Sequence, residues 1–163
     1  MDIKQAVTQK MKEVFLDDQR RINHAMKVLH HAEEIAKTEG LDANSSRIVT
    51  ITAILHDIGI KASENKYNSS AARYQEIEGP PVARRILEEL GVEEAVIERV
   101  CYIIGGHHTA SKINGPDFQI IWEADLLVNI QEKDAGISLS DKELLIKKNF
   151  KTALGEELAR KLF

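Results

Sequence analysis

The sequence has little cysteine and no long apolar run, and each shortage excludes a class of protein. A single cysteine, Cys101, excludes an intramolecular disulfide framework and a cysteine-rich zinc site. No apolar run approaches the roughly 20 residues that a membrane-spanning helix needs. The first residues, from Met1 onward, lack the apolar core of a signal peptide. We therefore expect a cytoplasmic protein with no membrane partner.

Positive charge is not in excess either. The 163 residues carry 22 Lys+Arg against 26 Asp+Glu, which gives a formal net charge of -4. A protein that binds nucleic acid through a general basic field needs the opposite balance. We therefore expect no nucleic-acid partner, while a local cationic pocket for one phosphate stays compatible with this composition.

Proline, glycine and aromatic residues are also scarce, with 3 prolines, 9 glycines and 5% aromatic residues. No Pro/Gly-rich linker divides the chain, and strict alternation of apolar and polar residues is hard to find. The sequence therefore predicts an all-α fold in one domain over residues 1–163. The expected helices cover residues 3–15, 18–38, 44–59, 80–90, 93–105, 117–131 and 140–161.

Four local expectations accompany these helices. The cap of the third helix is expected at Asn44, Ser45 or Ser46. Residues 60–78 are polar and small and are expected to include an irregular loop. Pro80 and Pro81 fit the first turn of the next helix. The last helix is amphipathic, which suits either packing on the core or a homodimer surface.

The third helix contains polar residues where an apolar side chain is expected. Residues 48–59 are apolar almost all round, as in a helix buried in the middle of a bundle, yet they include His56 and Asp57. Burying an ionised carboxylate costs several kcal/mol unless the group is paired or bound to a metal. Asp57 therefore needs a partner.

Other expected helices also carry polar residues on or at the edge of their apolar faces, namely His24, Asp125 and the pair His107-His108. Imidazole and carboxylate together suit a divalent transition ion such as Mn, Fe, Co, Ni or Zn. Each residue has an alternative interpretation: a histidine satisfied within the core, an aspartate that caps a helix or pairs with arginine, or an exposed helix end. The residues alone leave these alternatives open.

Three motifs of the sequence resemble the HD-domain superfamily of metal-dependent phosphohydrolases. They are His24-Ala25-Met26-Lys27-Val28, Ala53-Ile54-Leu55-His56-Asp57-Ile58-Gly59 and Glu123-Ala124-Asp125-Leu126-Leu127. The resemblance covers roughly residues 20–130, with the C-terminal helices expected to pack on that core. It implies a compact helical bundle in which one ion is held by His24, His56, Asp57 and Asp125.

A second ion is implied in those branches of the superfamily that hold two metals. His107 and His108 resemble the added ligands, and Glu78 stands where several such members carry histidine. Glutamate can bind a metal, so this departure leaves a second site open. The alternative for Glu78 is a favourable negative charge near a helix N-terminus.

The resemblance implies hydrolysis of a small phosphorylated metabolite, such as a nucleotide, by metal-activated water. Asp57 would act as ligand, and as proton acceptor if one of its oxygens stays free. Lys61 is a candidate catalytic residue and phosphate ligand, because it follows Asp57 by four positions. Further phosphate candidates are Arg20, Arg21 and Lys112, with solvated surface charges as the alternative.

Two other functions remain compatible with the sequence. A few di-iron members of the superfamily are oxygenases, for which Glu78 or His107 should matter as much as His56. A non-catalytic module that binds a nucleotide is the third hypothesis, and it would bind tightly without metal-dependent turnover.

Overall fold

The computed structural model describes residues 2–133 and 137–162, and in those ranges the chain is helical with no strand, as the sequence predicts. The helices are α1 (Ile3–Phe15), α2 (Gln19–Glu39), α3 (Ala43–Leu55), α4 (Ile60–Tyr67), α5 (Ala72–Glu89), α6 (Glu94–Ile104), α7 (Pro116–Glu132), α8 (Leu139–Asn149) and α9 (Ala153–Leu162), with a 3-10 turn η1 (Ala110–Lys112).

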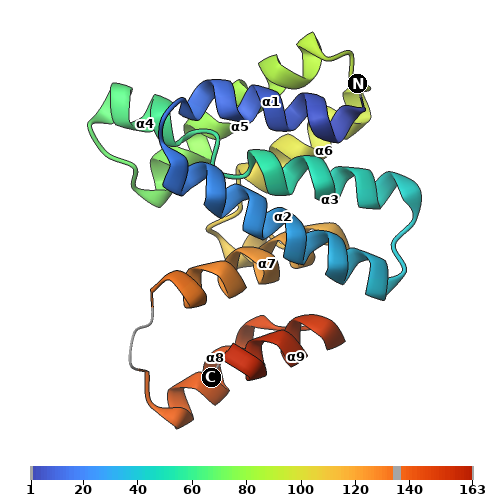
Figure 1. The fold of residues 1–163 in the computed structure, drawn as a ribbon, viewed down its shortest axis with the longest axis vertical. Helices are drawn as coiled ribbons and strands as arrows, with labels where there is room; N and C mark the ends of the chain where they lie inside the picture. The colour runs from blue at the N-terminus through green and yellow to red at the C-terminus, as the bar shows by residue number, and fades with distance from the viewer. Residues whose placement is uncertain (1, 134–136, 163) are drawn as a thin grey trace.

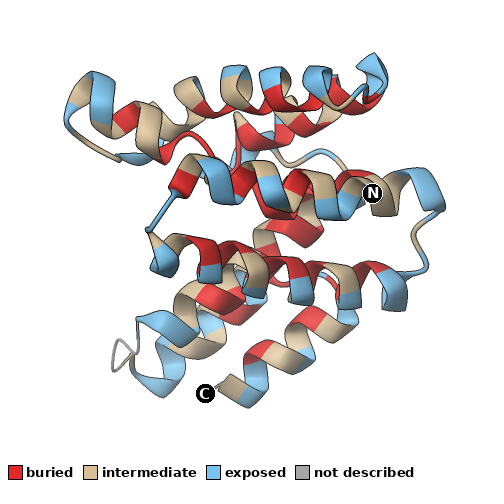
Figure 2. Ribbon diagram, turned by 45° about the horizontal axis from the view of Figure 1, so that its top comes forward, coloured by how far each residue is buried: buried red, intermediate tan, exposed pale blue. Residues whose placement is uncertain are grey.

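Helix α3 lies at the centre of the bundle, where it packs against α1, α2, α6 and α7. From Ile48 to Leu55 its residues are buried except Thr50, which matches the nearly continuous apolar character of this segment. Helices α4 and α5 pack together, α5 packs on α6, and α9 packs on α7 (Figure 1). Buried positions face the spaces between the helices, and exposed positions lie on the outside (Figure 2).

Residues 60–78 include an irregular loop, as expected, but it is short and most of the segment is helical. Residues 60–67 form α4, and α5 begins at Ala72, so only four residues connect the two helices. The polar composition of α4 reflects solvent exposure of one side, because only Ile60 and Ser63 of this helix are buried. Polar residues on the exposed side of a helix do not prevent it from forming.

Pro80 and Pro81 lie inside α5 and not in its first turn, so the expected position of these prolines is wrong. Each proline removes one backbone hydrogen bond, to the carbonyls of Glu76 and Ile77. Ile77 is 57% exposed, so the residue whose carbonyl loses its helical partner to Pro81 lies beside solvent. The helix nevertheless continues through both prolines to Glu89.

The third helix begins and ends earlier than predicted. Its cap is Asp42, whose side chain accepts a hydrogen bond from the Ser45 backbone nitrogen at 2.7 Å, and not Asn44, Ser45 or Ser46. Its last residue is Leu55, and His56–Gly59 form turns in which Ile58 N donates to Leu55 O and Ile60 N donates to Asp57 O.

The predicted helix over residues 140–161 is two helices, because α8 ends at Asn149 and α9 starts at Ala153. The buried Glu123 carboxylate of α7 accepts hydrogen bonds from the backbone nitrogens of Lys151 and Thr152, which directs these groups away from helical bonding. Phe150 is buried, whereas Leu144 is 66% exposed. Of the two helices α8 and α9, it is mainly α9 that packs on the core.

None of the helices in residues 2–133 and 137–162 combines the length and apolar character that a bilayer-spanning segment needs.

Replacing Leu16 with glycine should stabilise the protein. Leu16 has φ 54° and ψ -112° and is 75% exposed, at the second position of a turn closed by Asp18 N and Phe15 O. Such a turn favours glycine at this position. We expect Leu16→Gly to raise the free energy of unfolding by about 1 kcal/mol in urea titrations. Leu16→Ala keeps the strained conformation, so equal stability of the two variants would contradict this prediction.

Candidate metal centre

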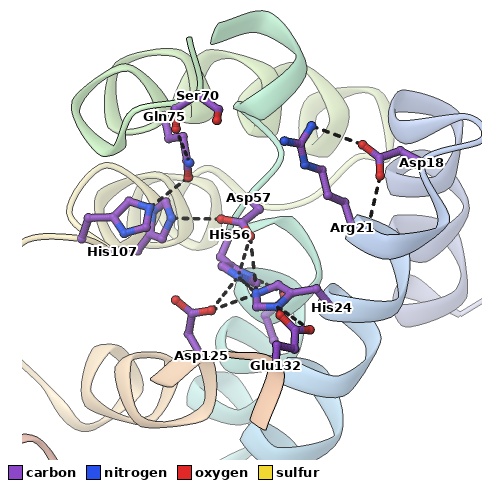
Figure 3. Close-up of polar contacts among 12 residues, drawn as sticks. Asp18, Arg21, His24, His56, Asp57, Ser70, Gln75, His107, Asp125 and Glu132 are labelled. Carbon is purple, nitrogen blue, oxygen red and sulfur yellow. Dashed lines mark hydrogen bonds and ion pairs between the residues drawn. The ribbon is translucent and has the colours of Figure 1, made fainter. Parts of the chain in front are cut away.

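Three segments of the bundle bring His24, His56, Asp57 and Asp125 together. Asp125 Oδ1 lies 2.9 Å from His24 Nε2 and 3.3 Å from His56 Nε2. Asp57 Oδ2 lies 3.5 Å from His24 Nε2 and 3.3 Å from His56 Nε2. Figure 3 shows these side chains pointing toward one another from α2, the turn after α3, and α7. The structure thus places the four predicted ligands in one cluster.

A tight helix crossing fixes the turn that carries His56 and Asp57. A Cβ atom added at Gly59 would lie 2.5 Å from Gly79 N and 2.7 Å from Gly79 Cα. Only glycine at position 59 lets α5 approach this closely. The crossing therefore holds the turn in place directly after the two candidate ligands.

The Nδ1 atoms of His24, His56 and the neighbouring His107 each have a partner. His56 Nδ1 donates to Ala53 O at 2.8 Å, and His107 Nδ1 donates to Ile104 O at 2.7 Å. His24 Nδ1 lies 3.2 Å from a Glu132 carboxylate oxygen. These partners leave the Nε2 atoms directed at the carboxylates, which is how histidine ligands are oriented in metal sites. The donor set therefore fits a divalent transition ion.

The charges in the cluster support the same interpretation. Burial lowers the pKa of His56, but the Asp57 and Asp125 carboxylates outweigh burial and raise this pKa well above its usual value. Burial raises the pKa of Asp57, yet the His56 and His107 imidazoles hold it well below its usual range. The carboxylates thus remain ionised against positive charge, which protons on the imidazoles or a metal ion can supply.

Asp57 also faces a second set of histidines. Its Oδ1 lies 3.3 Å from His107 Nε2, and ligand atoms of Asp57, His107 and His108 lie within 4.8 Å of one another. Burial, followed by the His107 imidazole, lowers the pKa of His108 to about 4, so its ring is neutral near pH 7. Asp57 can therefore bridge two ions.

The structure does not bring Glu78 into this cluster. Its carboxylate accepts a hydrogen bond from the Tyr67 hydroxyl at 2.9 Å and lies 3.4 Å from Lys66 Nζ. Gln75 and Glu76 of the same helix hold His108 instead: Gln75 Oε1 lies 2.9 Å from His108 Nε2, and Glu76 accepts from His108 N at 3.0 Å.

A pocket of about 260 Å³ opens over the first cluster. Arg20 and Arg21, two of the predicted phosphate residues, line it. Lys61 and Lys112 are not among its lining residues: Lys61 Nζ pairs with Asp18 at 3.1 Å, and Lys112 Nζ lies 3.5 Å from Gly105 O. Arg21 is also paired, with Asp18 and Glu64.

Sequence reasoning missed several residues at this pocket. Glu132 and Asn129 follow Asp125 by seven and four positions, so helical spacing alone could have placed them on its side of α7. Ser70, Gln75 and Lys133 have no comparable signal, since their places at the pocket depend on how the helices pack.

Replacing Glu132 with glutamine should weaken metal binding by about 10–100-fold, because partners that orient a histidine ligand have effects of this size. Glu132 is the side-chain partner of His24 Nδ1, whereas His56 and His107 use backbone carbonyls. Titration of the metal-free protein with Mn²⁺ and Co²⁺ measures the affinity. Glu39→Gln, at the exposed far end of α2, serves as the control, and equal affinities in the two variants would contradict the assigned role.

Comparison with known proteins gives two matches. The HD domain family matches residues 21–147. A crystal structure of a predicted HD superfamily hydrolase from an uncultured Thermotogales bacterium has a similar fold, with a TM-score of 0.68 and 23% sequence identity, over 95% of this chain and 82% of that chain. No curated protein matches.

Proposed function

The chain belongs to the HD domain family, and from this premise we propose that it is a metal-dependent phosphohydrolase acting on a small phosphorylated metabolite. The observation that carries the proposal is the convergence of two imidazole Nε2 atoms on the Asp57 and Asp125 carboxylates, beneath a pocket with arginines in its wall. The proposed metal ligands and the two arginines thus lie at the same pocket.

His24, His56, Asp57 and Asp125 would hold the ion. A bound divalent ion supplies Lewis-acid activation of water and of a phosphoryl oxygen. Arg20 and Arg21 in the pocket wall attract the phosphate and orient it over the four ligands. Arg21 acts there as part of an ion-pair network with Asp18 and Glu64, which fixes its guanidinium.

We assign proton acceptance to Asp57 Oδ1. Asp57 Oδ2 faces His24 and His56, so Oδ1 is the oxygen left for a proton when one ion is held. His107 Nε2 lies 3.3 Å from Oδ1 and can take the proton further. With two ions, Oδ1 would join His107 and His108 as a ligand, and this role would pass to another group.

Two alternatives make different predictions at the same cluster. A di-iron oxygenase needs the second set, Asp57, His107 and His108, to be filled with iron, without a contribution from Glu78 in the arrangement described. A nucleotide-binding module needs only the pocket and the ligand cluster, with no turnover.

Hydrolysis of p-nitrophenyl phosphate by protein loaded in turn with Mn, Fe, Co, Ni and Zn tests the proposal. We expect saturable turnover with at least one metal, abolished by chelation and restored by that metal. Adenosine 5′-monophosphate tests the nucleotide predicted from the sequence. Tight binding of nucleotide with no turnover under any metal would contradict the proposal and favour the binding module.

A further inference from the structure

Four polar side chains in the pocket wall have no partner within the described part of the chain. Arg20 in the first turn of α2, Ser70 before α5, Asn129 in α7 and Lys133 at the end of α7 all line the pocket. None of these side chains makes a hydrogen bond or ion pair with a residue that the structure describes. All four groups can donate hydrogen bonds, so together they suit a ligand rich in oxygen atoms.

The same wall offers little to a flat apolar group. Ile60 is the one aliphatic residue among the described lining residues, and no Phe, Tyr or Trp is among them. The imidazoles that line it are already engaged, His24 with Asp125 and Glu132, and His108 with Gln75. Nucleobases are commonly held by stacking on aromatic side chains, and ligand pockets for such groups are mostly apolar.

The charges that line the pocket suit one phosphate group. Three cations, Arg20, Arg21 and Lys133, face three carboxylates, Asp57, Asp125 and Glu132. A divalent ion at the cluster would bring two positive charges to these lining residues, which match the two negative charges of a phosphate monoester. Arg20 and Lys133 are the cations without a described partner and are therefore available to it.

From these features we infer that the substrate is the phosphate monoester of a small, hydroxyl-rich alcohol, such as a sugar or polyol, rather than a nucleotide. This inference rests on the proposed phosphohydrolase function and names its substrate class. Arg20 and Lys133 bind the phosphate beside the ion-paired Arg21, and Ser70 and Asn129 bind the hydroxyl groups of the alcohol. The volume of about 260 Å³ suits a compact ligand of this kind.

Ribose 5-phosphate and adenosine 5′-monophosphate form a matched pair for the test, since they share the ester and the sugar and differ in the base. We expect kcat/KM to be at least tenfold higher for ribose 5-phosphate, with p-nitrophenyl phosphate as the reference ester. Equal or higher kcat/KM for the nucleotide, or turnover of the reference ester alone, would overturn the inference and leave the phosphohydrolase intact. Turnover of none of the three would overturn both.

Two variants test which residues are responsible. Asn129→Leu keeps the size of the side chain and removes the amide, so we expect kcat/KM for ribose 5-phosphate relative to p-nitrophenyl phosphate to fall at least fivefold. Arg20→Gln should raise KM for both esters about tenfold, because both carry the phosphate. Arg85→Gln, exposed on α5 and outside the pocket, is the charge-matched control. An unchanged ratio in Asn129→Leu would overturn the role assigned to the hydroxyl groups.

Discussion

Asp57→Asn should lower kcat/KM toward p-nitrophenyl phosphate by about 10³-fold or more. A bound metal contributes several kcal/mol of transition-state stabilisation, and each 1.36 kcal/mol corresponds to a factor of ten in rate. Asp57 Oδ2 faces His24 and His56 while Oδ1 faces His107. Asparagine keeps this shape but directs an amide NH₂ at one of the two sets. Steady-state kinetics with the best metal measures the loss.

The control for this variant is Asp17→Asn, an exposed aspartate in the turn between α1 and α2. It removes the same charge from the chain and should keep full activity. Circular dichroism of both variants shows whether the fold is retained. A folded Asp57→Asn protein that keeps a tenth or more of wild-type activity would contradict the assigned role of Asp57.

Glu123→Ala should lower the free energy of unfolding by about 4 kcal/mol. The Glu123 carboxylate is fully buried and accepts hydrogen bonds from Lys151 N at 2.9 Å, Thr152 N at 3.1 Å and the Thr152 hydroxyl at 2.6 Å. Each buried donor left without a partner costs about 1–3 kcal/mol, and the deleted side chain leaves a cavity in addition. Urea denaturation followed by circular dichroism measures the change.

A double-mutant cycle with Gly155 makes this prediction specific. A Cβ atom at Gly155 would overlap the Glu123 Oε1 atom, so Gly155→Ala alone should also be strongly destabilising. Once Glu123 is alanine, the tightest contact of the added methyl group is gone and the Thr152 hydroxyl oxygen, 2.6 Å from that Cβ position, is the close atom that remains, so Gly155→Ala should cost less. Additive effects would mean that the two positions act independently, which would contradict a close contact between them. Glu156→Gln on the exposed side of α9 is the control.

The sequence was sufficient to predict the all-α fold and to indicate the four candidate metal ligands. His24, His56, Asp57 and Asp125 could be found because polar residues on apolar faces need a compensating partner. Their convergence depends on helix packing that periodicity alone does not specify. The family resemblance provided that information, and the match over residues 21–147 confirms the family.

The features that were missed depend on contacts between distant parts of the chain. The break between α8 and α9 is associated with hydrogen bonds to Glu123, 28 positions before Lys151. Glu132 holds His24 across 108 positions. Lys61 was expected at the phosphate because it follows Asp57 closely, but α4 directs its ammonium group to Asp18. Spacing in sequence could not reveal these pairings.

Metal content measured by mass spectrometry on reconstituted protein tests the proposed metal centre most directly. We expect at least one tightly bound equivalent of a transition metal per chain in the wild type, held by His24, His56, Asp57 and Asp125. We also expect loss of that equivalent in a folded Asp57→Asn variant. A wild-type protein that stays empty after exposure to Mn, Fe, Co, Ni and Zn, or a variant that retains its metal, would contradict a metal centre at these residues.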